Sequence, residues 1–397
     1  SQIWSEIIYA QWLNSGHNTS PANQQPLSVN DLRPNLALRS QIEKYNKRLN
    51  GELDESDEDE PMQDWSFNEL DATLNITCER NASHTLISIN PSAGTTRTPL
   101  DICCVVDVSG SMDTEATVKS ADGSTESHGL SILDVVKHAL KTVIAGLSDN
   151  DRFSLVKYSN SAEVVLGLTV MDSFGKSSAN ASVDSLHVEG STNLWDGIEK
   201  GLNVIRAANT NKNAALFVLT DGLPNVSPSR GELHSLQRYR EKYGDIPCSI
   251  DTFGFGFSLD SSLLKSLSNE GHGAFAFIPD SGMVGTIFVN AMSNQLTTAA
   301  TNLKLSVEFY NGEFDESDTT HTIYSWNKVA DEFIFDLGSI QFGQSKDLVL
   351  PVRLSGEDLK AHVSIQYNVP GSTHVKTIMG EHNISQSVST KLLSHLL

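Results

Sequence analysis

Five oxygen-bearing side chains in three separate motifs have the chemistry of a site for a hard divalent cation. The apolar run "LDICCVVD" ends in Asp107, and Ser109 and Ser111 follow in a tight turn. "EGSTNLWDG" places Thr192 ahead of a helical stretch, and "FVLTDGLPN" places Asp221 at the end of another apolar run. Carboxylate and hydroxyl oxygens suit Mg²⁺, with Mn²⁺ or Ca²⁺ as alternatives. Because the hydroxyls are neutral, the two carboxylates only balance the ion, which can still accept a carboxylate from a partner protein.

Each motif also has a purely structural interpretation. Asp-x-Ser-Gly-Ser alone is an ordinary turn, since Asp and Ser are common in turns and at helix N-termini. The combination favours the metal site, because the motifs of Thr192 and Asp221 follow in order on an α/β pattern. The sequence contains no phosphate-binding G-x-x-x-x-G-K-[ST] loop and no G-x-S-x-G motif, so we assign no catalytic residue.

Residues 100–298 alternate short apolar runs with amphipathic stretches. The runs are typical of strands that are covered on both faces: "DICCVV", "FSLVKY", "ALFVLT", "SIDTFGF" and "AFAFI". Between them, apolar residues such as Ile132 and Val136 recur at helical spacing. This alternation predicts a doubly wound parallel sheet of the α/β class. Ligands of such sheets bind beyond the carboxyl ends of the strands, where Asp107 and Asp221 are expected.

The segments on both sides of this region have a period of two. After residue 299, residues such as Leu303 and Leu305 alternate with polar ones, which is typical of an antiparallel sheet with one solvated face. Residues 66–99 contain short β-like runs. We expect 66–99 and 299–397 to form one β-sandwich, with the α/β domain of residues 100–298 inserted between its strands.

The quoted motifs carry a family resemblance. "DVSGSM", "STNLWDG" and "LTDGLPN" resemble the metal-ion-dependent adhesion site of von Willebrand factor type A (VWA) domains. The resemblance implies a Mg²⁺-dependent protein-binding domain whose ligands are Asp107, Ser109, Ser111, Thr192 and Asp221. "FGFGFSLDSSLL" resembles a subgroup in which a β-rich segment follows the domain. The insertion "DTEATVKSADGSTESHG" lies beside the expected metal, where it either shapes partner choice or is a tolerated surface loop.

A second resemblance lies within residues 1–49. "YAQWLNSGHNTSPANQQPLSVNDLRPNLALRSQIEKY" resembles the second half of a U-box, a zinc-free RING-like module of ubiquitin ligases. It implies a small α+β partial U-box that binds a ubiquitin-conjugating enzyme through Trp12 and Pro21, without a covalent intermediate. Trp12 also fits a core position, and Pro21 also fits a turn. The first loop of the module would precede Ser1, so we leave open whether the truncated module is active.

Composition restricts the remaining possibilities. The net charge of −21 argues against nucleic-acid binding, and no apolar run is long enough for a membrane span. Residues 50–65 contain "GELDESDEDEP" and are interpreted as an acidic linker. The four cysteines form no C-x-x-C pair, which favours a reducing cytoplasm. Six glycosylation sequons point weakly the other way, so a nuclear or secreted protein remains an alternative: Asn18, Asn75, Asn81, Asn180, Asn225 and Asn383.

The two resemblances together predict a U-box-type ubiquitin ligase whose metal-bearing A domain captures a protein substrate or partner. The alternative is a non-enzymatic, metal-dependent binding protein that acts in adhesion or as a scaffold.

Overall fold

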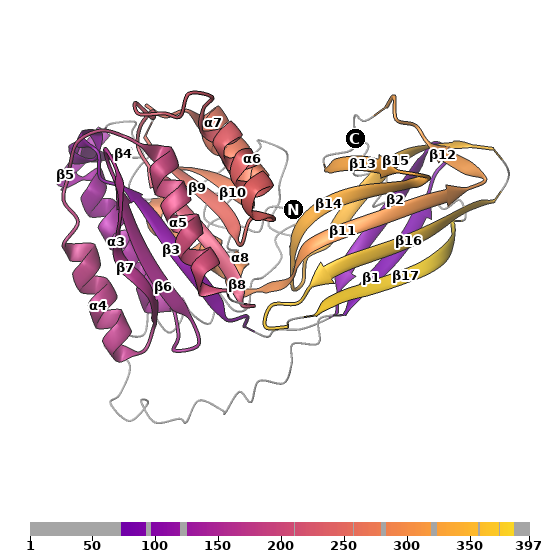
Figure 1. Ribbon diagram of the computed structural model, residues 1–397, viewed down its shortest axis with the longest axis horizontal. Helices are drawn as coiled ribbons and strands as arrows, with labels where there is room; N and C mark the ends of the chain where they lie inside the picture. The colour runs from indigo at the N-terminus through magenta and orange to yellow at the C-terminus, as the bar shows by residue number, and fades with distance from the viewer. Residues whose placement is uncertain are drawn as a thin grey trace. The chain divides into compact units, whose positions relative to one another are not determined.

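A computed structural model describes residues 73–384, except 93–96, 120–124, 210, 257, 279–282, 319–323, 356–357 and 373 (Figure 1). The predicted partial U-box and acidic linker lie outside the described residues. The chain divides into two compact units. Of the described residues, one contains those of 100–209 and 214–295, and the other contains those of 73–99, 211–213 and 296–384.

The first unit is an α/β domain built on a six-stranded sheet. In order across the sheet, the strands are β10 (His272–Ile278), β9 (Ser249–Phe255), β8 (Asn213–Thr220), β3 (Leu100–Asp107), β6 (Arg152–Tyr158) and β7 (Ala162–Val170). Its helices are α3 (Ile132–Gly146), α4 (Ser173–Asp184), α5 (Leu194–Ala208), α6 (Glu232–Tyr243), α7 (Ser261–Glu270) and α8 (Val284–Leu296). Every predicted apolar run of this domain forms a strand.

Helices cover both faces of the sheet, as the α/β prediction requires. On one face, α5, α6 and α7 pack Leu202, Leu236 and Leu264 against the strands. On the other face, Phe288 of α8 stacks on Phe253 of β9, with ring centroids 4.5 Å apart. Among the described residues, no helix combines the length and apolarity that a bilayer crossing demands.

The sheet is mixed rather than wholly parallel. β3 pairs with β6, β8 with β9 and β9 with β10 in parallel, whereas the edge strand β7 runs antiparallel to β6. The sequence prediction of a parallel sheet therefore needs one correction. The reason is local: only residues 159–161 connect β6 to β7, and so short a connection allows a hairpin but no crossover.

The adjacent cysteines of β3 contribute to packing. Cys103 belongs to the core beneath α5, and successive side chains of a strand point to opposite faces, so Cys104 faces the other side. Both are fully buried, and all four cysteines are free thiols. Burial raises the pKa of the Cys103 thiol to about 12, so the reactive thiolate is scarce at neutral pH.

The insertion before the first helix forms a hairpin, β4 (Glu115–Lys119) with β5 (Thr125–Ser131). A short 3₁₀ helix, η3 (Gly110–Asp113), leads into it from the turn after β3. The hairpin ends at the N-cap of α3, where Ser131 and Asp134 form a capping box.

The second unit is the expected β-sandwich. One sheet contains β1 (Leu74–Arg80), β2 (His84–Pro91), β15 (Lys346–Leu354) and β12 (Gly312–Phe314), in that order. The other contains β13 (Ser325–Val329), β14 (Glu332–Gln341), β11 (Thr298–Tyr310), β16 (Leu359–Asn368) and β17 (Val375–Ile384). Ile87 and Leu348 of the first sheet share a core with Leu305, Phe335 and Val363 of the second. Because β2 pairs with β15, the strands that precede the α/β domain join the strands that follow it.

Candidate metal centre

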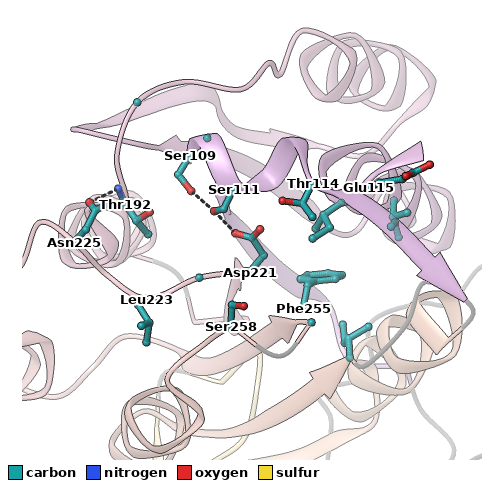
Figure 2. Close-up of a pocket in the computed structure, with 18 residues that line it drawn as sticks. Ser109, Ser111, Thr114, Glu115, Thr192, Asp221, Leu223, Asn225, Phe255 and Ser258 are labelled. Atoms are coloured by element: carbon teal, nitrogen blue, oxygen red, sulfur yellow. Dashed lines mark hydrogen bonds between the residues drawn. The ribbon is translucent and has the colours of Figure 1, made fainter. Parts of the chain in front are cut away.

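The predicted ligands come from three loops at the carboxyl ends of strands in the mixed sheet. Figure 2 shows four of them: Ser109, Ser111, Thr192 and Asp221. Asp107 is the last residue of β3, and Asp221 directly follows β8, which is the neighbour of β3 in the sheet. Ser109 and Ser111 lie in the turn and η3 after β3, and Thr192 lies in the loop before α5. The carboxyl-end rule therefore places these side chains together, although more than a hundred residues separate the first from the last.

Three of the five side chains are in direct contact. The hydroxyl oxygens of Ser109 and Ser111 are 3.1 Å apart, and Ser111 donates a hydrogen bond of 2.7 Å to Oδ1 of Asp221. Figure 2 draws these two contacts as dashed lines, with Thr192 nearby on its own loop. The arrangement presents hydroxyl and carboxylate oxygens to one small volume.

Asp107 lies behind this group, fully buried and outside the lining of the pocket. Its Oδ1 accepts a hydrogen bond of 2.8 Å from the backbone N–H of Ser109. Its Oδ2 accepts one of 2.6 Å from the hydroxyl of Thr220 and a longer one of 3.4 Å from Tyr158. Asp107 thus supplies negative charge from beneath and fixes the turn that carries the serines.

The charge of both carboxylates is costly in this setting. Burial raises the pKa of Asp107 above its usual value, although its hydrogen bonds act in the opposite direction. Burial, together with the nearby Asp107, raises the pKa of Asp221 to about 6, while the Ser111 hydroxyl opposes that shift. Two acids held close together in a shielded place are stabilised by a cation between or beside them.

The Thr192 loop is held by Asn225, which was not among the predicted site residues. Oδ1 of Asn225 accepts a hydrogen bond of 2.8 Å from the backbone N–H of Thr192, and the N–H of Asn225 donates one of 3.1 Å to the Thr192 carbonyl. Asn225 follows Asp221 in "TDGLPN", so it ties two ligand loops together. The sequence feature that could have pointed to this role is the position of Asn225 in a turn motif close to a predicted ligand.

Asn160 holds the same loop from the other side. Its Oδ1 accepts a hydrogen bond of 3.0 Å from the backbone N–H of Ser191. Gly190 has a φ of +23°, and a Cβ there would lie 2.7 Å from the Asn160 amide, so this position requires glycine. The backbone N–H of Gly110 donates a hydrogen bond of 3.2 Å to the Gly190 carbonyl, which joins the Thr192 loop to the serine turn.

Four of the five predicted ligand residues line a pocket of about 550 Å³. Its polar end consists of Ser109, Ser111, Thr192 and Asp221. Among the described residues, none of the side chains that line it is a Lys, Arg or His. An all-oxygen donor set without a competing cation fits a hard divalent ion such as Mg²⁺.

Trp12 and Pro21, the predicted surface for a ubiquitin-conjugating enzyme, lie outside the described residues. Their assignment stays a prediction, as does the choice of metal ligands.

Comparison with known families agrees with both resemblances. Residues 101–290 match the von Willebrand factor type A domain, and residues 5–50 match the U-box domain. A solved structure, the von Willebrand factor type A protein from Catenulispora acidiphila, has the same fold at a TM-score of 0.60 and 15% identity, over 81% of this chain and 75% of that one.

Two curated relatives are also similar. The uncharacterized protein sll0103 of Synechocystis is 22% identical over 307 residues, which cover 74% of this chain and 68% of that protein. The E3 ubiquitin-protein ligase WAV3 of Arabidopsis thaliana is 29% identical over 170 residues, which cover 41% of this chain but only 20% of WAV3.

Proposed function

The chain carries a von Willebrand factor type A domain at residues 101–290, and we propose that this domain captures a protein partner through a divalent cation, most simply Mg²⁺. The observation that carries the proposal is the group formed by Ser109, Ser111 and Asp221 above the buried Asp107. A bound cation supplies positive charge that a partner's carboxylate can coordinate.

The residues of this chain have separate tasks in the proposed capture. Ser109, Ser111 and Thr192 offer neutral oxygens, so they orient the ion without cancelling its charge. Asp221 offers a carboxylate at the pocket, and Asp107 balances charge from below while it holds the serine turn.

We further propose that captured partners are substrates for ubiquitin transfer. The match of residues 5–50 to the U-box and the similarity to the ligase WAV3 support this proposal. The module would hold a ubiquitin-conjugating enzyme, with Trp12 and Pro21 at the contact, while the A domain holds the acceptor protein. Such an arrangement acts by raising effective concentration and needs no nucleophile in this chain.

Reconstituted ubiquitination tests the ligase proposal. The full-length natural protein is combined with activating enzyme, ubiquitin, Mg-ATP and a panel of conjugating enzymes, and we expect self-modification with at least one of them. The substitutions Trp12→Ala and Pro21→Ala are expected to abolish this self-modification with ubiquitin. Absence of product with every conjugating enzyme would contradict the proposal. Chelation is unsuitable as a control because the activating enzyme needs Mg-ATP.

A second candidate function is metal-dependent binding without transfer. It is favoured by the position of the candidate metal centre, since all of its loops lie within residues 101–290 and partner capture requires nothing from the U-box. This alternative predicts partner binding that EDTA abolishes, in a chain that discharges no conjugating enzyme.

We propose a reducing cytoplasmic location. The four free cysteines support it, and burial raises the thiol pKa well above its usual value in three of them: Cys78, Cys103 and Cys248. Mass spectrometry of the natural protein is expected to show no glycan at Asn225, whose sequon lies at the rim of the pocket. Occupancy at that site would favour a secreted protein.

A further inference from the structure

The pocket is larger than the metal centre and continues into an apolar arm. We define the arm by Ala116, Ile132, Val135, Phe255 and Ile278, all of which line the pocket. They come from the hairpin strand β4, the first turn of α3 and the ends of β9 and β10. In the view of Figure 2, the ring of Phe255 lies on the other side of Asp221 from Thr192.

Volume indicates that more than one side chain can enter. A pocket of about 550 Å³ lies in the range of sites that bind whole small molecules, roughly 300–1,000 Å³. A cation and one carboxylate fill only its polar end. The arm is therefore available to a neighbouring side chain of the same partner.

Charge and polarity decide which neighbour fits. Glu115 and Asp221 line the pocket, so a second acid would meet like charge. Phe255 and Ile278 are buried and close the arm, whereas Ala116 and Ile132 are half-buried and expose apolar surface to it. Leu223, with 59% of its surface exposed, also lines the pocket. A large apolar side chain would cover this wall and introduce no charge.

We propose that the pocket is a two-part recognition site for a protein segment in which Leu, Ile, Met or Phe lies within two residues of the carboxylate that the metal accepts. The inference rests on the proposed metal-dependent capture and names the sequence class of the partner. It also assigns a role in partner binding to the β4–β5 hairpin, because Ala116 of β4 forms part of the arm.

Peptide display on the full chain tests the proposal. One library fixes Asp between two random positions on each side, and a second fixes Asn instead. In Mg²⁺ we expect Leu, Ile, Met or Phe to be enriched beside Asp, and the enrichment to vanish in EDTA. If peptides of the Asn library are enriched as strongly as those of the Asp library, or if neither library is enriched, the proposed metal-dependent capture is wrong. The proposed role of the apolar arm is then wrong as well. If acidic peptides are captured without any apolar preference, the capture stands and the arm alone is overturned.

A substitution that fills the apolar arm provides a second test, in which peptide affinity is measured. Ala116→Phe is expected to lower the affinity for the selected peptide about tenfold, which corresponds to about 1.4 kcal/mol. The affinity for the same peptide with glycine at the apolar position should change less than about twofold. Val135→Thr, a near-isosteric polar change, is expected to act in the same direction and serves if Ala116→Phe misfolds. Ala181→Phe on the exposed surface of α4 is the control and should change neither affinity. Equal losses for both peptides, or no loss for either, would overturn the arm.

Discussion

The hydroxyl of Ser111 donates a hydrogen bond of 2.7 Å to Oδ1 of Asp221, which lies 110 residues later in the chain. This contact joins the turn after β3 to the turn after β8, two neighbouring strands of the sheet. It places a neutral oxygen directly beside a carboxylate, with the second carboxylate, Asp107, buried behind them. Negative charge is thus concentrated where the fold gains no compensating Lys or Arg from the residues that line the pocket.

Replacing Asp107 with asparagine removes the negative charge but keeps the size and shape of the side chain. The amide keeps an oxygen for the Ser109 N–H, and the hydroxyls of Thr220 and Tyr158 can reorient to accept from its NH₂. We expect Mg²⁺ affinity to fall at least about tenfold, measured by calorimetry, while metal-free stability stays equal or rises by about 1 kcal/mol, since a buried charge is removed.

Asp149→Asn is the matched control for that experiment, because it removes one negative charge from the exposed surface. It should leave Mg²⁺ affinity unchanged. Unaltered affinity in Asp107→Asn would remove Asp107 from the metal centre. Loss of folding would instead show that its hydrogen bonds require the charge.

Asn225→Ala should weaken metal binding through the position of Thr192. The substitution removes the acceptor for the Thr192 N–H, and the exposed location of Asn225 limits the effect on folding. We expect a loss of Mg²⁺ affinity of about five- to tenfold, comparable to about 1 kcal/mol for a lost hydrogen bond. Ser227→Ala is a sharp control, since it destroys the same sequon but leaves the Asn225 side chain in place. If both variants behave alike, the effect does not come from the Thr192 contact.

The ligand loops and the domain class were predictable because they follow from short-range rules. Apolar runs with turn residues at their ends mark covered strands, and the carboxyl-end rule then places Asp107 and Asp221 at one edge. The β-sandwich was predictable for the same reason, since its period of two is local. These signals need no knowledge of which residues meet in space.

The supporting contacts were not predictable from such rules. Tyr158 and Thr220 reach Asp107 across separations of 51 and 113 residues, and nothing in their local sequence marks them. The antiparallel edge strand β7 was not predicted because it has no fully buried residue and so lacks the continuous apolar run of the central strands. The hairpin that forms the base of the apolar arm comes from a polar stretch, in which pairing partners decide strand formation more than propensity does.

The stability of the α/β domain should depend on the buried Asp251 of β9. Its carboxylate accepts hydrogen bonds of 2.8 Å from the N–H of Ala274 and 2.9 Å from the amide of Gln295, yet burial raises its pKa to about 6. The folded state therefore holds this proton more tightly than the unfolded state, whose Asp pKa is about 3.9. The stabilising contribution is complete below about pH 4 and is lost as the pH rises through about 6.

Comparison with Asp251→Asn isolates that contribution. The free energy of unfolding of the wild type minus that of the variant should fall by about 2 kcal/mol between pH 4 and 6.5, measured by urea titration at fixed pH values. Asp149→Asn should leave the difference nearly constant over the same interval. A difference that stays constant over this interval would show that folding does not raise the pKa of Asp251.

Gly197 allows α5 to lie close enough to the sheet to support the metal centre. A Cβ at this position would lie 2.7 Å from Cδ1 of Tyr158 and 3.0 Å from Cγ1 of Val105. Gly197→Ala must therefore displace the ring whose hydroxyl contacts Asp107, and we expect a destabilisation of about 1–3 kcal/mol together with weaker Mg²⁺ binding. Gly146→Ala, at the end of α3 with no atom within 4 Å of the added carbon, should instead stabilise the fold by about 0.4–1 kcal/mol. Urea unfolding and calorimetry on both variants measure the two effects. A Gly197→Ala chain that is as stable as Gly146→Ala would show that α5 does not press on Tyr158.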